Sequence, residues 1–174
     1  MKEDLIKFAT KWHERQKRKY TFEPYINHCL QVAEMAETYN IPFGYEIGLF
    51  HDLLEDTLCS TESLRTILFS KYSNNEIDFI INGVVSLTDI YVPANFPSLN
   101  RLKRKILEAE RLAEILPTYQ SVKYCDLINN TSSIVLYDPK FAVNYLEEKK
   151  YILSLMNKGD INLYNEALKN VTNG

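Results

Sequence analysis

The spacing of hydrophobic residues along this chain follows the helical period almost from end to end. Leu5, Phe8, Ala9 and Trp12, for example, fall on one stripe of a first helix. We expect that helix to run on into the basic residues 15–19. The pattern predicts helices at about 5–19, 24–39, 40–54, 60–68, 76–87, 98–116, 122–128 and 138–158, and a last helix that Asp160 caps.

Two segments fit this pattern less well. Residues 76–87 are rich in Ile and Val, so a short strand is the alternative to a helix there. Residues 89–98 contain two prolines and form the one long irregular stretch, which either connects two helices or covers a site. Pro117 is expected to end the helix before it. The pattern otherwise predicts an all-α fold, a single domain over residues 1–174.

Composition narrows the functional classes. The 174 residues carry a net charge of −3, which argues against a general nucleic-acid binder. The chain has no apolar run of about 18 residues, so we expect no membrane segment. Cys29, Cys59 and Cys125 are odd in number and far apart, and we interpret them as small buried residues, neither zinc ligands nor disulfides, in a reducing cytoplasm. We expect a cytoplasmic domain.

The segment HDLLEDT carries the candidate chemistry. On a continuous helix, His51 and Glu55 are four positions apart, as are Asp52 and Asp56. One imidazole and three carboxylates would then lie on one side, among leucines. So much negative charge repels itself unless a cation lies within it.

Two further residues extend this set. His28 lies within PYINH on the preceding helix, and Asp126 lies within the apolar run VKYCDLINN. Together with His51 and Asp52 they make two nitrogen and two oxygen donors, which suit Mn, Zn or Fe. Singly, each has a simpler interpretation, because a histidine on an apolar helix is more often a hydrogen-bonded core residue. We assign His13 to that class.

The motifs FEPYINH, GLFHDLLEDT and VKYCDLINN, in this order, resemble the HD superfamily of metal-dependent phosphohydrolases. The fuller set is similar to the hydrolase domain of the RelA/SpoT alarmone enzymes and to the stand-alone small alarmone hydrolases. The resemblance covers nearly the whole chain, from FATKWHERQKRK to about Lys158.

The resemblance implies a role for each matching residue. The metal, usually one Mn²⁺, would be held by His28, His51, Asp52 and Asp126. Glu55 and Asp56 match the pair that positions and activates the attacking water. The nucleotide contacts match Arg18, Lys19 and Asn130. The implied reaction removes the 3′ pyrophosphate of (p)ppGpp and returns GDP or GTP, so the expected partner is a small nucleotide.

Departures from the family's pattern leave two alternatives open. Leu127 stands where a basic residue is usual, Cys29 replaces a proline, and residues 20–22 replace small ones. The same chemistry could therefore act on another nucleotide, such as NADPH at its 2′-phosphate or a nucleoside monophosphate. A nucleotide-binding regulator without catalysis is the second alternative, although Glu55 and Asp56 argue against it. Cations beyond the metal could come from Arg101, Arg104 or Lys123.

Overall fold

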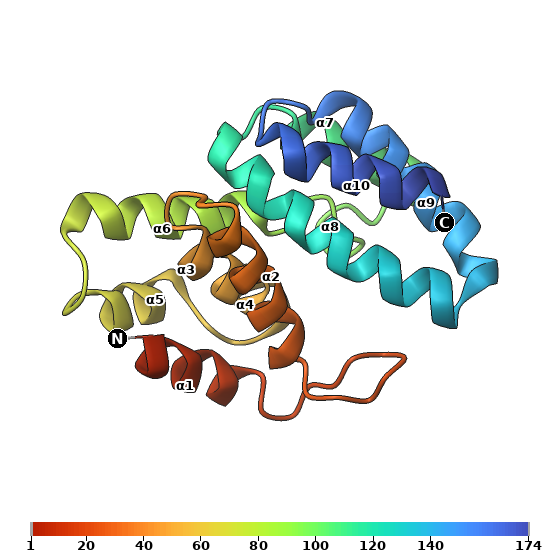
Figure 1. Cartoon of the computed structure of the whole chain (residues 1–174). Helices are drawn as coiled ribbons and strands as arrows, with labels where there is room; N and C mark the ends of the chain where they lie inside the picture. Colours follow the sequence, from red (N-terminus) through yellow and green to blue (C-terminus); the bar gives the residue numbers. More distant parts are fainter. Residues whose placement is uncertain (1, 174) are drawn as a thin grey trace. The chain divides into compact units, whose positions relative to one another are not determined.

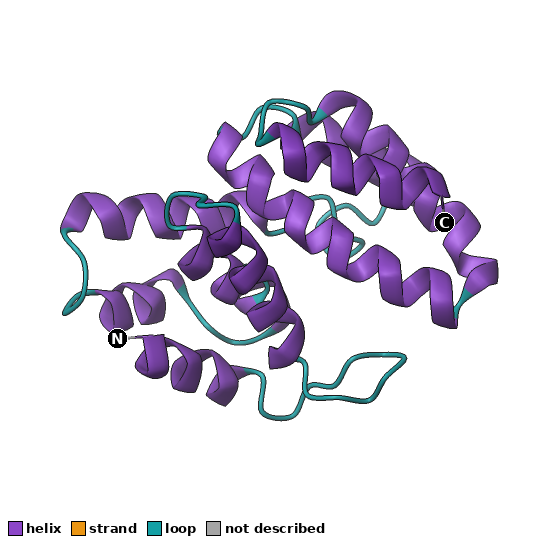
Figure 2. Ribbon diagram, viewed as in Figure 1, coloured by secondary structure: helices purple, strands orange, loops and turns teal. Residues whose placement is uncertain are grey.

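The computed structural model describes residues 2–173, and every regular element within that range is a helix (Figures 1 and 2). Lys17 and Pro24 add one isolated antiparallel bridge. The predicted all-α class is confirmed. The chain forms two compact units, Met1–Thr88 and Asp89–Gly174, which are described one at a time.

The first unit contains six of these helices in chain order. They are α1 Lys2–Trp12, α2 Ile26–Thr38, α3 Gly44–Phe50, α4 Leu53–Asp56, α5 Thr61–Leu68 and α6 Asn74–Leu87. Every residue of α3 is buried, and α3 packs on α2 and α6. A Cβ on Gly48 would come within 2.9 Å of the Ala33 backbone, so glycine permits the close contact of α3 with α2.

Caps explain several boundaries in this unit. The Ser60 hydroxyl accepts a hydrogen bond from the backbone N–H of Ser63 at the start of α5. The backbone N–H of Ser73 donates to Glu76 at 2.7 Å, half of a capping box that begins α6. The alternative of a strand at residues 76–87 was therefore wrong.

The second unit holds α7 Arg101–Leu112, α8 Pro117–Tyr137, α9 Pro139–Leu155 and α10 Ile161–Asn173. The long helix α8 packs on α9 and α10, and α7 packs on α9. Tyr124 is fully buried at the centre of α8, and its hydroxyl donates to the Met156 carbonyl at 2.8 Å. The Asp160 side chain caps α10, as predicted.

The segment before α7 is irregular, as expected. Its backbone is held by Glu108, a buried residue of α7 that accepts hydrogen bonds from the N–H groups of Ile90 and Tyr91, both at 3.0 Å. Arg111 pairs with the other carboxylate oxygen of Glu108. These contacts tie the first residues of the segment to the helix that follows it.

Several predicted boundaries were wrong, and the helix predicted at 122–128 extends over Pro117–Tyr137. The first helix ends at Trp12, before the basic residues 15–19. Pro117 does not end a helix, because the preceding one ends at Leu112; it is the first residue of α8, where its missing N–H costs nothing. The predicted helix at 40–54 is divided, since residues 51 and 52 form a turn between α3 and α4.

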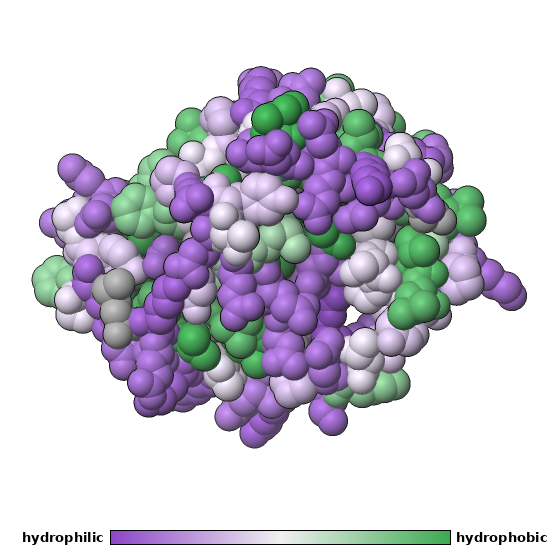
Figure 3. Space-filling view, in the orientation of Figure 1, coloured by the Kyte–Doolittle hydropathy of each residue, from purple (hydrophilic) through white to green (hydrophobic). Residues whose placement is uncertain are grey.

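Surface character agrees with the composition. The face drawn in Figure 3 is mostly hydrophilic, with hydrophobic residues scattered over it. Among residues 2–173, no helix combines the length and the apolar character that crossing a membrane requires.

Candidate functional site

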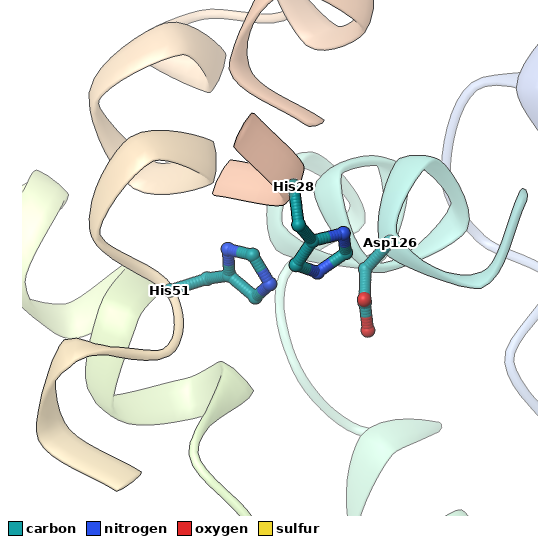
Figure 4. A group of neighbouring side chains, drawn as sticks. All are labelled: His28, His51 and Asp126. Atoms are coloured by element: carbon teal, nitrogen blue, oxygen red, sulfur yellow. The ribbon is translucent and has the colours of Figure 1, made fainter. Parts of the chain in front are cut away.

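Two buried histidines face each other in the first unit. His28 lies in the first turn of α2, and His51 directly follows α3. Their ring centroids are 5.1 Å apart with the planes at 67°, and both side chains are almost completely excluded from solvent (Figure 4). Asp126, labelled in the same figure, belongs to α8 and is described with the second unit.

A hydrogen bond fixes the orientation of His51. Its Nδ1 lies 2.6 Å from the carbonyl oxygen of Gly48, which can only accept, so Nδ1 donates to it and Nε2 is the nitrogen that faces Asp52. The bond also explains why the predicted helix is divided. In a continuous helix the Gly48 carbonyl would accept from the backbone N–H of Asp52, and the His51 ring competes for it.

Asp52 brings a carboxylate to both rings. Its Oδ2 lies 3.0 Å from Nε2 of His51 and 3.6 Å from Nε2 of His28. A neutral imidazole lone pair and a carboxylate oxygen repel each other at such distances. Either a proton or a metal ion between them removes the repulsion, and two imidazoles with one carboxylate are donors that Mn, Zn and Fe accept. The residues present therefore fit a divalent transition metal.

Tyr25 holds the carboxylate in place. Its hydroxyl donates to Oδ2 of Asp52 at 2.8 Å, and its ring packs edge-on against His28. This is the outer partner that usually orients a ligating carboxylate. The sequence analysis missed this role, although Tyr25 lies within the quoted PYINH motif.

Cys29 and His13 surround the same cluster. One ligand atom each of Cys29, His51 and Asp52 lie within 4.8 Å of one another. Cys29 Sγ also lies 3.7 Å from Nε2 of His13, whose Nδ1 contacts the Gln16 side chain. His13 is buried, as predicted. All three cysteines are buried and free of disulfides.

Glu55 and Asp56 lie on α4, the turn of helix that follows Asp52. Both side chains are accessible to solvent. Partial burial raises the pKa of Asp56, the neighbouring Asp52 raises it further, and His13 opposes the shift. A carboxylate with a raised pKa accepts a proton more readily near neutral pH.

The basic pair Arg18 and Lys19 lies on the loop between α1 and α2 (Figure 1). Backbone hydrogen bonds close this loop, from Arg18 N–H to the Glu23 carbonyl at 2.9 Å and from Tyr25 N–H to the Gln16 carbonyl at 3.1 Å. The Gln16 side chain then donates to the Asp56 carbonyl at 2.6 Å. The base of the loop is therefore anchored to the cluster through Tyr25 and Gln16.

The second unit carries the other two predicted site residues, Asp126 and Asn130, one turn apart on α8. Asn130 donates its amide to Oδ1 of Asp126 at 2.6 Å, and Lys123 pairs with Oδ2 at 2.9 Å. Both oxygens of this buried carboxylate are thus oriented by neighbours on its own helix. The hydrogen bond from Asn130 to Asp126 was not predicted from the sequence pattern.

Comparisons with known proteins give a consistent picture. No family model matches the chain. It is 37% identical over 82 residues to a probable guanosine-3′,5′-bis(diphosphate) 3′-pyrophosphohydrolase of Mycoplasma genitalium, covering 47% of this chain and 11% of that protein. A probable guanosine-3′,5′-bis(diphosphate) 3′-pyrophosphohydrolase of Mycoplasma pneumoniae is 31% identical to this chain over 136 residues, which cover 74% of this chain and 17% of that protein.

A further relative is a GTP pyrophosphokinase of Streptomyces coelicolor, 34% identical over 89 residues, which cover 51% of this chain and 10% of that protein. The chain thus spans less than a fifth of the length of each of these relatives. Among solved structures, a metazoan orthologue of SpoT that hydrolyses ppGpp matches with a TM-score of 0.78. The match has 20% identity and covers 98% of this chain and 93% of the other. The predicted resemblance to RelA/SpoT-type hydrolases is confirmed.

Proposed function

We propose that this chain is a metal-dependent hydrolase that removes the 3′ pyrophosphate from (p)ppGpp and leaves GDP or GTP. The observation that carries the proposal is the buried cluster of His28, His51 and Asp52, in which a carboxylate faces two imidazole nitrogens. The names of the relatives, which include 3′-pyrophosphohydrolases of this nucleotide, support the choice of substrate.

The metal would be held by His28, His51, Asp52 and Asp126, and we propose Mn²⁺. A divalent ion there lowers the pKa of water and neutralises charge on phosphoryl oxygens. Asp126 comes from the second unit, so the proposal makes both units parts of one hydrolase domain. The three cysteines are buried and form no disulfides, which supports a location in a reducing cytoplasm.

The chain's own residues supply the proton transfers. Glu55 and Asp56 accept the proton of the attacking water, and their accessibility lets solvent and substrate reach them. Water adds to the phosphorus bonded to the ribose 3′ oxygen, that bond breaks, and the ribose oxygen takes a proton as pyrophosphate is released. Tyr25 keeps Asp52 directed at the two imidazoles throughout.

The substrate contacts are proposed from the matching motif positions. Arg18 and Lys19 would bind the base and phosphates, since the ends of their loop hydrogen-bond to Asp52 through Tyr25 and to the Asp56 backbone through Gln16. Asn130 would contact the ribose while its amide also orients Asp126.

The test is incubation of the purified, metal-stripped chain with ppGpp, with and without Mn²⁺, followed by anion-exchange separation of the products. We expect GDP and pyrophosphate to form only with Mn²⁺. NADPH and a nucleoside monophosphate, run in parallel, should react far more slowly. Faster turnover of either one would replace the proposed substrate, and bound ppGpp without product would replace catalysis by binding.

A further inference from the structure

A buried thiol lies beside the histidine cluster of the first unit. Cys29 directly follows His28 on α2, and its side chain is fully excluded from solvent. One ligand atom each of Cys29, His51 and Asp52 lie within 4.8 Å of one another, and all three residues belong to the first unit. Spacing alone did not predict Cys29 as a zinc ligand, because His51 and Asp52 lie far along the chain from it.

These three donors match the size of a tetrahedral zinc site. Zn²⁺ binds thiolate sulfur at about 2.3 Å and imidazole nitrogen at about 2.0 Å, which places the ligand atoms of one ion about 3.5 Å apart. Atoms within 4.8 Å of one another reach such an ion through small side-chain movements. Two of the donors already have fixed positions, since Gly48 orients the His51 ring and Tyr25 orients Asp52.

His13 is placed to accept the thiol proton. Its Nε2 lies 3.7 Å from Sγ of Cys29, and its Nδ1 contacts the side-chain oxygen of Gln16. The amide nitrogen of Gln16 donates to the Asp56 carbonyl at 2.6 Å, so the amide oxygen is the atom that faces His13 and accepts from Nδ1. A cysteine binds metal as the thiolate, and the proton that the metal displaces from Sγ passes to Nε2 of His13.

The sulfur changes which ion these residues prefer. Thiolate is a soft ligand that selects Zn²⁺, whereas Mn²⁺ is better matched by oxygen donors. Zn²⁺ also binds more tightly than Mn²⁺ to a given set of nitrogen and oxygen donors. Cys29 therefore adds to the affinity for zinc much more than to the affinity for manganese.

The zinc ligands overlap with the residues proposed to hold manganese, because His51 and Asp52 belong to both sets. Nδ1 of His51 bonds to the Gly48 carbonyl, which leaves the ring one nitrogen for a metal. That nitrogen can bind one ion at a time. We propose that Cys29, His51 and Asp52 form an inhibitory Zn²⁺ site, in which zinc excludes the catalytic ion. The inference rests on the proposed function only for the identity of the excluded ion and for the activity that is lost.

The test is optical titration of the metal-stripped full chain with Co²⁺, a spectroscopic substitute for Zn²⁺. A thiolate bound to Co²⁺ gives an intense charge-transfer band in the near ultraviolet, which nitrogen and oxygen ligands do not give. We expect this band in the wild type and its loss in Cys29→Ser, which keeps the size of the side chain and removes the soft donor. In calorimetric titrations, Cys29→Ser should weaken Zn²⁺ binding at least about 10-fold more than Mn²⁺ binding.

The matched control is Cys59→Ser, which changes the other buried thiol of the first unit. That thiol donates to the Ser60 carbonyl at 3.7 Å. The control should keep the band and change the Zn²⁺ affinity by less than about 2-fold. Absence of the band in the wild type, an unchanged band in Cys29→Ser, or equal loss in both serine variants would overturn the inference. If Cys29→Ser does not fold, Cys29→Ala takes its place under the same criteria.

The outcomes also separate this inference from the proposed function. A band that depends on Cys29, in a chain that does not hydrolyse ppGpp, would support the zinc site and refute the activity. Hydrolysis of ppGpp with Mn²⁺ by a chain that lacks the band would do the reverse. If both hold, Zn²⁺ should inhibit turnover in competition with Mn²⁺, and Cys29→Ser should raise the Zn²⁺ concentration for half-inhibition at least about 10-fold. Inhibition that is the same in Cys29→Ser would overturn the inhibitory role of the site.

Discussion

The two units each contain a shielded cluster of charged side chains, and the two clusters differ in how their carboxylates are paired. In the first, Asp52 faces the Nε2 atoms of His28 and His51, an arrangement that a cation stabilises. In the second, Asp89 pairs with Lys105 at 3.0 Å and Asp126 pairs with Lys123 at 2.9 Å, so each carboxylate already has a cation of the protein beside it.

The two clusters also differ in how their residues are held. Two of the three donors of the first have a hydrogen-bonded neighbour, since Gly48 fixes His51 and Tyr25 fixes Asp52. The carboxylates of the second are held by the long side chains of Lys105 and Lys123. A metal site needs fixed ligand geometry, whereas an ion pair made by a flexible lysine tolerates movement.

The largest expected effect is loss of the cation partner through Asp52→Ala. Without its carboxylate, the first cluster keeps two imidazoles and loses the negative charge that attracts a divalent ion. We expect Mn²⁺ binding to be abolished and turnover of ppGpp to fall at least about 10³-fold. Titration calorimetry with Mn²⁺ and the product assay measure the two effects.

Asp78→Ala is the control for that change, because Asp78 is a surface carboxylate of the same unit, paired with Arg65. It should leave both readings close to wild type. Full activity in Asp52→Ala would refute the assignment of the first cluster as the metal site.

A smaller effect is expected from Glu55→Gln, which removes a proton acceptor without touching the imidazoles or Asp52. Mn²⁺ affinity should stay near the wild-type value while kcat falls about 10²- to 10³-fold. Glu62→Gln, an exposed change on α5, serves as the control. Loss of metal binding in Glu55→Gln would make Glu55 a ligand and not the base.

Tyr25→Phe tests whether fixed geometry matters. It removes the hydroxyl that donates to Asp52 and keeps the ring against His28. We expect Mn²⁺ affinity to fall about 10-fold. Tyr72→Phe is a close match, because that hydroxyl donates to the Glu46 carboxylate at 2.7 Å in the same unit. Equal metal affinity in both variants would contradict a positioning role for Tyr25.

Much of the fold could be predicted because helical periodicity and caps are local signals. Asp160 caps the last helix, as predicted, and Ser60 caps the helix that begins where the pattern placed it. Two of the errors arose where a side chain competes for a backbone group. The His51 ring bonds to the Gly48 carbonyl, and the predicted helix is divided there. In α8 the hydroxyls of Ser132 and Ser133 donate to the Asn129 carbonyl, so polar residues continue a helix whose predicted length was too short.

The candidate site was predictable where its residues are neighbours in sequence. His51 and Asp52 are adjacent, and the motif that includes His28 has a recognisable spacing. Tyr25 was missed because its contact with Asp52 depends on how α2 and α3 pack.

The smallest expected effect concerns stability and the charge of Lys149. Its pKa falls from 10.5 to about 8 in the fold, through burial and the nearby Lys123 and Lys105, against the attraction of Asp126 and Asp89. Between these pH values the unfolded chain binds more protons, so the contribution of Lys149 to stability rises with pH. The free energy of unfolding of the wild type and of Lys149→Met can be measured in urea from pH 7 to pH 10.5. At pH 7 the variant should be the more stable, by on the order of 1 kcal/mol after solvent screening, and the difference should shrink as the pH rises. Lys150→Met should show no such trend. A stability difference that stays constant with pH would mean that the fold does not disfavour the charged form of Lys149, against the lowered pKa.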